Sequence, residues 1–597
     1  MREGKEARGK WPIITGAALA LFAMAFLILA GWHVVRPMDS VFIDDYGALS
    51  LSHGLAGDIN FGGARGNVVT QLRYTHPGIP YQFVSWLAFR AATIKGSDAF
   101  ERAAIVFDDP NRFFVISCLF ATVISIAGMV AWWCVGRKFG ADSLVLLGSL
   151  LLPLCSTESW RYYVSLGNET FALPLFAGYA WLLAILSRKS GLGEAPSPFR
   201  SYWVAVLCFG IIGGLAFLVK LNYLVWMIAI PMGMVLIAIR RRESRAPLFR
   251  FTGMLALATP VGLATAYLGC LIFIGHEGIR EMFARHLGIA VHSGRYGSGE
   301  ATVLSAGEMI QNAERLLFEN PGIILIPLSI LLIGILVRRK KRVKRWNDLE
   351  AFLIATATVT FLLALAATLK HFAPRYLLCG TLAIGLTMVI EVPRWPKLVR
   401  SLFVFGVVAF AAIGLEYYRG EIQKNRAFLA EVEKVESELA ALEEGFSVCY
   451  YHPRHPDGEV AWAMDMCASR DAALAWIESD LAQNMRFYGD SLKSRTRWGT
   501  DRVRLDEVPW RYIWMRANYD EFWSNTRKGT DPNTAGNLGP SSTYFDGRIA
   551  KVHQAETFLV LERSEEDFSI ALEEWNRRSP KPKKSKKRKS RIGSRKE

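Results

Sequence analysis

The sequence predicts a polytopic α-helical membrane protein that carries a small C-terminal α/β domain. Hydrophobic residues make up 51% of the 597 residues and occur in long blocks, and basic residues gather in the short segments between these blocks. A helix needs about 20 apolar residues to cross a bilayer, and by this rule the chain holds about eleven candidate spans. They lie near residues 11–35, 113–136, 142–157, 170–187, 202–220, 222–239, 250–275, 320–337, 350–369, 375–391 and 400–417.

The basic residues predict the topology. The formal net charge of +16 would suit a nucleic-acid binder, but these residues cluster between spans and in the last stretch of the chain. With the N-terminus inside, every strongly basic loop falls on the inner side, as the positive-inside rule requires. Block 11–35 is too long for a signal peptide and lacks a cleavage site, so we expect it to stay as an anchor. We expect a bacterial inner-membrane protein with no nucleic-acid partner.

The expected domains follow from this topology. They are a transmembrane domain at 1–418 with its first outer loop at 36–112, an extracytoplasmic α/β domain at 419–578, and a disordered basic tail at 579–597. In the outer domain we expect an amphipathic helix that stops at Gly445, β-like runs at Phe446–Tyr451 and Thr557–Leu561, and a helix at Ala472–Gln483. In an oxidising compartment Cys449 and Cys467 would form a disulfide, although two free thiols are the open alternative.

The first outer loop carries two adjacent carboxylates, Asp44 and Asp45, a few residues beyond the first span. Neighbouring acids repel each other, and nearby lipid lowers the dielectric, so one of them is expected to have a raised pKa suited to accepting a proton. The alternative is that they solvate the loop or cap a helix that starts at Tyr46. Helical spacing of apolar residues then predicts one helix that ends at Gly57 and a second, aromatic one from Tyr81 to Phe89.

A basic and aromatic segment lies between two late spans. It contains Lys370, His371, Arg375 and Tyr376. A point charge and a guanidinium fork suit a lipid phosphate, whereas the alternative is that these side chains are anchors at span ends. In the second outer loop Arg161 is a candidate for substrate binding, and Glu169 is a further one because a carboxylate that enters a span is costly.

The loop at 276–318 holds the remaining candidates. His286, His292, Arg295 and Tyr296 are expected to contact substrate, in a polar helix followed by a Gly-rich loop. His and Glu at these intervals suggest a metal as the alternative, but neither the HExxH spacing nor a Cys/His cluster is present. No metal is therefore expected, and the Walker, Rossmann and GxSxG motifs are also missing from the sequence.

The chain resembles the GT-C glycosyltransferases in three features. These are the tandem acids in the first outer loop, His76-Pro77 near its end, and an Arg-Tyr-Leu-Leu segment before a late span. Within that group it looks most like the enzymes that use polyprenyl-phosphate sugars, such as protein O-mannosyltransferases and lipid A aminoarabinose transferases. The family's Lys-Pro-Pro is His76-Pro77-Gly78 here, so its Lys contact to phosphate is not carried over.

The resemblance implies a transferase that takes a sugar from a polyprenyl-phosphate donor with inversion and passes it to an envelope acceptor that the sequence does not name. Asp44, or Asp45, would be the base, and Lys370 and Arg375 would stabilise the leaving phosphate without a cofactor. The partners would be this donor and membrane lipids. A lipid-linked glycan polymerase or ligase, a transporter, and a non-catalytic scaffold are the alternatives.

Overall fold

The structure is a computed structural model. It describes residues 46–61, 78–156, 158–189, 199–240, 253, 256–271, 279–280, 291–292, 306–339, 346–440, 447–450, 485–488, 512–516, 549–554, 558–563, 566, 569–570 and 573. The chain divides into two compact units, and the first ends at Ala427 apart from a short later segment. We describe each unit by itself.

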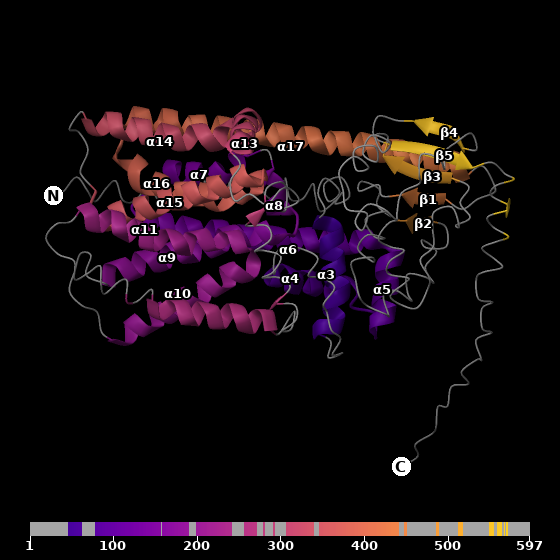
Figure 1. Ribbon diagram of the computed structural model, residues 1–597, viewed down its shortest axis with the longest axis horizontal. Coiled ribbons are helices and arrows are strands. Elements are labelled where there is room, and N and C mark those ends of the chain that lie inside the picture. Colours follow the sequence, from indigo (N-terminus) through magenta and orange to yellow (C-terminus); the bar gives the residue numbers. More distant parts are fainter. Residues whose placement is uncertain are drawn as a thin grey trace, which may run out of the picture. The chain divides into compact units, whose positions relative to one another are not determined.

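The first unit is helical (Figure 1). Its described elements are α3 (Tyr46–Phe61), α4 (Ile79–Ala92), α5 (Ala99–Asp108), α6 (Pro110–Lys138), α7 (Ser143–Leu151), η2 (Leu152–Cys155), α8 (Ser159–Val164), η3 (Asn168–Phe171), α9 (Ala172–Lys189), α10 (Phe199–Val219), η4 (Leu221–Leu224), α11 (Val225–Arg240), α13 (Ala306–Glu319), α14 (Pro321–Arg339), α15 (Asp348–Lys370), η6 (Pro374–Leu377), α16 (Leu378–Glu391), η7 (Val392–Arg394) and α17 (Lys397–Ala440). The segments labelled η are 3₁₀-helices.

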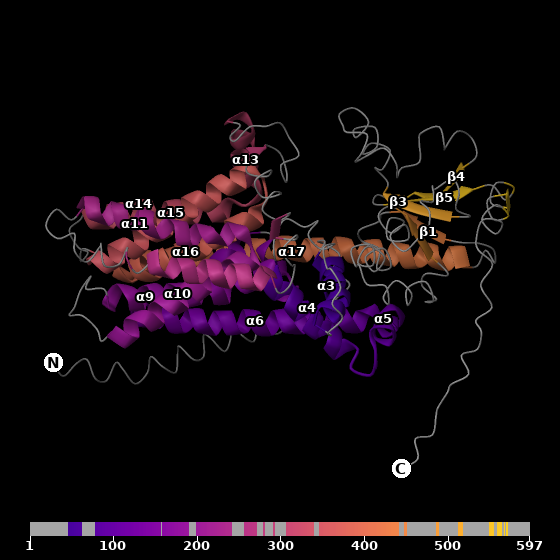
Figure 2. The same cartoon turned by 60° about the horizontal axis from the view of Figure 1, so that its bottom comes forward.

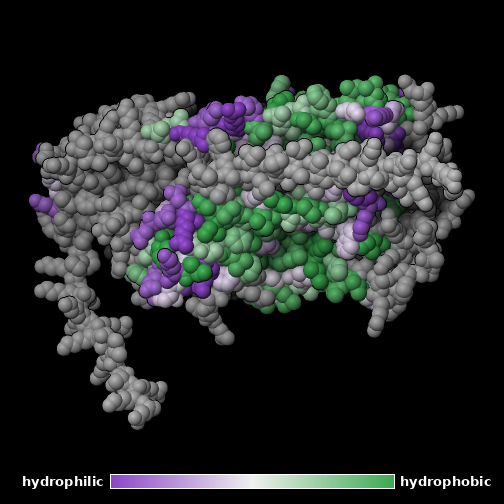
Figure 3. All heavy atoms as spheres, turned by 180° about the vertical axis from the view of Figure 1, so that it is seen from behind, coloured by the Kyte–Doolittle hydropathy of each residue, from purple (hydrophilic) through white to green (hydrophobic). Residues whose placement is uncertain are grey.

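Within the described residues, five helices are long and apolar enough to cross a membrane, judged by length and composition. They are Pro110–Lys138, Pro321–Arg339, Leu349–Lys370, Pro374–Arg394 and Lys397–Ala427, and shorter apolar helices are Ser143–Cys155, Val206–Val219, Asn222–Gly233 and Ala256–Leu271. These positions agree with the sequence prediction. The first predicted span, 11–35, lies outside the described residues, so the count of about eleven stays a prediction. Figure 3 shows a broad apolar belt on this unit with polar patches on both sides of it.

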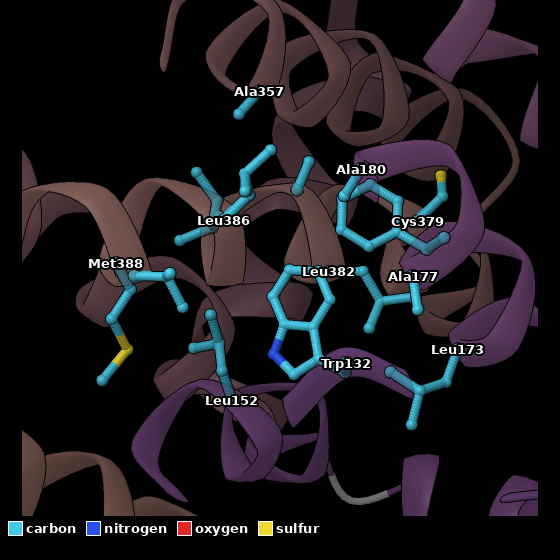
Figure 4. Close-up of a cluster of buried hydrophobic side chains, with 14 of the residues drawn as sticks. Trp132, Leu152, Leu173, Ala177, Ala180, Ala357, Cys379, Leu382, Leu386 and Met388 are labelled. Carbon is cyan, nitrogen blue, oxygen red and sulfur yellow. The ribbon is translucent and has the colours of Figure 1, made fainter. Parts of the chain in front are cut away.

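Helix α16 is the centre of the bundle. All of its residues are buried, which is the position expected for a helix that is apolar on every face. Next to it, the Trp132 indole donates a hydrogen bond to Ser149 Oγ over 3.0 Å, so that this large side chain is buried without an unpaired polar atom. Figure 4 shows Trp132 among apolar side chains from α6, α9, α15 and α16, including Leu382 and Leu386.

The predicted end of the first helix at Gly57 is wrong, because α3 continues to Phe61. A Cβ at Gly57 would lie 2.5 Å from the Cβ of Trp86 on α4. The glycine therefore permits two helices to pack closely and does not terminate one of them. The predicted start at Tyr46 and the aromatic helix around Tyr81–Phe89 are confirmed by α3 and α4.

The predicted domain boundary at residues 418 and 419 falls inside α17, which is continuous over Lys397–Ala440. Gly420 is the only glycine or proline after Gly414 in this helix. One glycine weakens a helix by about 1 kcal/mol relative to alanine and does not end it. Hence one helix includes both the last predicted span and the predicted amphipathic segment.

Glu391, at the end of α16, is the centre of a buried polar knot. Its carboxylate is 3% exposed and accepts hydrogen bonds from Arg338 Nη2 at 2.6 Å, from the Trp346 indole at 2.6 Å and from the Trp395 indole at 3.3 Å. The Arg338 guanidinium also lies 3.6 Å from the centre of the Trp346 ring. The knot joins α14 and α16 to the segments that precede α15 and α17. Nearby, Arg394 pairs with Glu350, and Arg400 with Asp142 at 2.6 Å.

Close helix packing predicts opposite effects of two Gly→Ala changes. A Cβ at Gly214 in α10 would lie 2.6 Å from Thr265 Cβ and 2.7 Å from the Gly262 carbonyl oxygen, whereas Gly406 in α17 has no such neighbour within 4 Å. Gly214→Ala should therefore lower the free energy of unfolding by about 1–3 kcal/mol. Gly406→Ala should raise it by about 0.5–1 kcal/mol through helix propensity. Thermal unfolding of the two purified variants would check this, and a stable Gly214→Ala protein would contradict the packing.

The second unit contains a mixed five-stranded sheet with strand order β2-β1-β3-β5-β4. The strands are β1 (Ser447–Tyr450), β2 (Met485–Tyr488), β3 (Tyr512–Arg516), β4 (Ile549–Gln554) and β5 (Phe558–Arg563). Strand β1 is parallel to both β2 and β3, and β5 is antiparallel to β3 and β4. The two β-like runs predicted from sequence are confirmed by β1 and β5. The predicted helix at Ala472–Gln483 lies outside the described residues, so the α/β class and the outer location stay predictions.

Candidate functional site

Three 3₁₀ turns meet at one end of the bundle. Segments η3, η4 and η6 lead directly into α9, α11 and α16, so each begins a helical run. Glu169 of η3 and Lys220, which precedes η4, form an ion pair whose side chains are 0% and 1% exposed. The turns place residues far apart in the sequence in direct contact. A charge pair buried to this degree costs desolvation on both sides and persists only with close partners.

The third turn supplies the other charged and aromatic groups. The Lys220 ammonium lies 4.9 Å from the centre of the Tyr376 ring, a cation–π distance. Burial lowers the pKa of Lys220, the Glu169 carboxylate opposes this shift, and the positive charge of Arg375 adds to it. Lys220 therefore contacts both the carboxylate of the first turn and the aromatic ring of the third.

Neutral polar groups surround the ion pair. Among the residues that the structure describes, hydrogen-bond partners are missing for both amide atoms of Asn222, for Asn168 Oδ1 and for the Tyr223 hydroxyl, all of which are buried. Buried polar groups are normally paired, and a polar ligand is one way to pair them. The Tyr223 ring stacks on Trp226 with the ring centres 5.3 Å apart.

The start of α4 lies against this site. Gly78 caps α4 with a left-handed backbone at φ 55°, and a Cβ there would lie 3.0 Å from Asn168 Oδ1. Glycine is the residue that adopts this conformation without strain, and here it also lets the backbone approach η3. The start of α4 therefore packs against η3, at the residue that precedes the ion-paired Glu169.

Helix α8 supports η3 from the other side. The Thr170 hydroxyl lies 3.1 Å from the Tyr162 carbonyl oxygen and 3.0 Å from that of Ser165, and it accepts a bond from the Gly167 N–H. Arg161 stacks on the Tyr162 ring at 5.0 Å and pairs with Glu158 at 3.5 Å. Because Arg161 and Glu158 are partly exposed, they form a surface pair, and the structure does not bring Arg161 into the buried cluster.

No protein-family model and no curated protein sequence matches the chain. Solved structures do resemble it. Two are crystal structures of ArnT from Cupriavidus metallidurans, one bound to undecaprenyl phosphate and one in the apo state. Their TM-scores are 0.45 and 0.43, each at 10% identity, and the alignments cover 91% of this chain and 99% of that one. At this identity and score the likeness carries no argument about substrate or mechanism.

The predicted site residues are divided between described and undescribed parts of the chain. Asp44, Asp45, His76, His286, Arg295, Tyr296 and Cys467 lie outside the described residues, and of Cys449 only its place in β1 is described. Glu169, Arg375 and Tyr376 come together at the buried cluster. Lys370 ends α15, His371 caps it, and His292 lies in an isolated described segment. Within the described ranges no group of three or more His, Cys, Asp or Glu side chains suits a metal.

Sequence reasoning missed the role of Lys220, Asn222 and Tyr223. Lys220 had no predicted role and is the last residue of the predicted span 202–220. The signal was present, since a lysine between two apolar blocks must find a partner or reach water. Its partner is 51 positions earlier in the chain, and no spacing rule for a single helix connects the two.

Proposed function

We propose that this chain is a membrane glycosyltransferase of the GT-C type, which moves a sugar from a polyprenyl-phosphate donor to an acceptor on the outer side of a bacterial inner membrane. The observation that carries the proposal is the buried cluster of Glu169, Lys220, Arg375 and Tyr376. It places a buried ion pair, an arginine, an aromatic ring and several neutral polar groups where α9, α11 and α16 begin. Those are the features required to hold a phosphodiester and the hydroxyls of a sugar.

In this proposal Arg375, with Lys370 and His371 from the same turn, holds the donor phosphate. Glu169 and the Tyr376 ring hold the Lys220 ammonium in one position, so its positive charge is already oriented when the donor binds. Charge that develops on the leaving phosphate would be stabilised by groups already oriented toward it, which is often the largest single contribution to catalysis. No metal is needed in this scheme.

The acid–base chemistry is assigned to the first outer loop. Asp44, or Asp45, accepts the proton of the acceptor hydroxyl or amine as its oxygen or nitrogen bonds to the anomeric carbon. The bond from that carbon to the phosphate oxygen breaks, and polyprenyl phosphate leaves with the electron pair. Attack from the face opposite the phosphate inverts the anomeric centre. Support for this placement is the contact of Gly78 with Asn168, which ties the end of the same loop to the cluster.

The deciding experiment compares wild-type membranes with membranes that carry Asp44→Asn. We expect loss of labelled sugar from a polyprenyl-phosphate-sugar pool to slow by about 100- to 10,000-fold, because the proton acceptor is removed. Asp39→Asn, a nearby acid without a role in the proposal, is the matched control and should leave turnover near wild type. The labelled envelope fraction would identify the acceptor.

Equal turnover in wild type and Asp44→Asn would refute the assigned base. If neither membrane consumed the donor, the polymerase or ligase alternative would come first, and His286 and Arg295 would be the next residues to change.

A further inference from the structure

Helix α13 lies across the direction of the spans. In Figure 1 it is seen nearly end-on, whereas α14 and α15 lie along the page, and in Figure 2 it rises away from the side of the bundle. A single residue, Asn320, separates its end at Glu319 from the start of α14 at Pro321. If α14 crosses a bilayer, α13 runs roughly parallel to the bilayer surface.

One face of α13 is fixed to the turn that carries part of the candidate site. Asn312 Nδ2 donates to the Leu369 carbonyl oxygen at 2.7 Å, and Leu316, one helical turn later, is fully buried. The Arg315 guanidinium lies 4.2 Å from the centre of the Phe372 ring. Both contacts are made with the segment that leads from α15 into η6, so the position of α13 and the position of this turn depend on each other.

The angle between α13 and α14 is also fixed. Asn320 is 1% exposed, and its side-chain oxygen lies 3.1 Å from Ser156 Oγ, which donates to it. Its backbone N–H still bonds to the Leu316 carbonyl oxygen at 2.9 Å, which completes the last turn of α13. Because Asn320 is buried and hydrogen-bonded through both its side chain and its backbone, the connection between α13 and α14 is rigid.

A second face of α13 is apolar and exposed. Ile310 is 62% exposed and Leu317 is 42% exposed, and with Ala313 they follow the i, i+3, i+7 spacing of a single helix face. The remaining exposed side carries Gln311 and Glu314 and is polar apart from Phe318, which is 83% exposed and lies seven positions after Gln311. Helix α13 therefore has a docked face with Asn312 and Leu316, an apolar face with Ile310 and Leu317, and a polar face with Gln311 and Glu314.

We infer that α13 is an interfacial helix, whose apolar face inserts into the lipid surface and thereby anchors the turn from Leu369 to Tyr376. Lipid is the occupant because α14, which begins one residue after α13 ends, is apolar enough to cross a membrane and exposes Leu325 at 41%, Leu328 at 47% and Leu331 at 59%. The charged side chains of α13 are three acids and one arginine, so apolar insertion and not attraction to anionic lipid would hold it. This inference stands whether or not the protein transfers a sugar.

The test uses the full chain in vesicles of phosphatidylcholine that contain a phospholipid with a photoreactive group on its acyl chain. After illumination, mass spectrometry locates the cross-links. We expect them on Ile310 and Leu317 as well as on Leu328 and Leu331 of α14, and not on Gln311 or Glu314. Cross-links on α14 with none on α13 would overturn the inference, and α14 serves as the internal control for labelling.

A matched pair of variants tests the anchoring. Leu317→Glu and Gln311→Glu add the same side chain to the apolar and the polar face. Leu317→Glu should reduce acyl cross-linking of α13 on the order of tenfold, as expected when one buried Leu is replaced by a charge. It should also speed hydrogen exchange of the backbone amides at His371 and Tyr376, which bond to Ala367 and Ala373. Gln311→Glu should change neither. Equal exchange at these amides in the two variants would show that lipid contact does not position the turn.

Discussion

Glu169→Gln is expected to lower the free energy of unfolding by about 3–5 kcal/mol, because it leaves the Lys220 charge buried without its partner. The pair is closed off from solvent, so water cannot replace the lost carboxylate. Thermal or denaturant unfolding of the purified protein in a bilayer mimetic would measure the loss. Glu158→Gln is the control, since its pair with Arg161 is partly exposed and such pairs contribute about 0–1 kcal/mol.

The double variant separates stability from function. Glu169→Gln combined with Lys220→Met replaces the ion pair by neutral groups, and replacing a buried pair in this way is often neutral or stabilising. We expect it to recover most of the stability that Glu169→Gln loses. Sugar transfer should stay low in the double variant, because the positive group near the donor phosphate is gone. A stable double variant with normal transfer would show that the pair is structural only.

Glu391→Gln is expected to lower the free energy of unfolding by about 2–4 kcal/mol, since one carboxylate satisfies Arg338 and two indole N–H groups at once. An amide offers one oxygen for four N–H donors and brings an NH2 group of its own. The same unfolding assay measures the effect, with Glu416→Gln as control because its pair with Arg419 is largely exposed.

The two glutamates should differ in function. Glu391 contacts none of the candidate site residues that the structure describes, so the fraction of Glu391→Gln protein that remains folded should transfer sugar at the wild-type rate. A variant that is fully stable, or one that is stable and inactive, would contradict the structural role of the knot.

The helices could be predicted from sequence because each requires only local information. A run of apolar residues with polar ends locates α6, α14 or α15 within a few residues, and β1 and β5 were found as short β-like runs. Gly57 shows the limit of this approach. A glycine late in a helical pattern is a common stop signal, and only the position of Trp86 on a neighbouring helix shows that it serves close packing.

The candidate site was only partly predictable for the same reason. Glu169 and Arg375 were proposed because each charge lies at the end of an apolar block, which is a local feature. Lys220 has the same feature, but its importance comes from meeting Glu169 and Tyr376, and contact between distant segments is set by how the bundle packs. Helix α13 was missed because its identity depends on which face docks on α15 and which stays exposed.

The three 3₁₀ turns have one more consequence, which concerns the backbone. Each begins a helical run, and the unpaired N–H groups at the start of a helix present a partial positive charge. Because the contacts of Lys220 with Glu169 and Tyr376 bring η3, η4 and η6 together, the amino ends of three helical runs lie close to one another. In the proposed function, part of the attraction for the donor phosphate would therefore come from the backbone, which no single side-chain substitution removes.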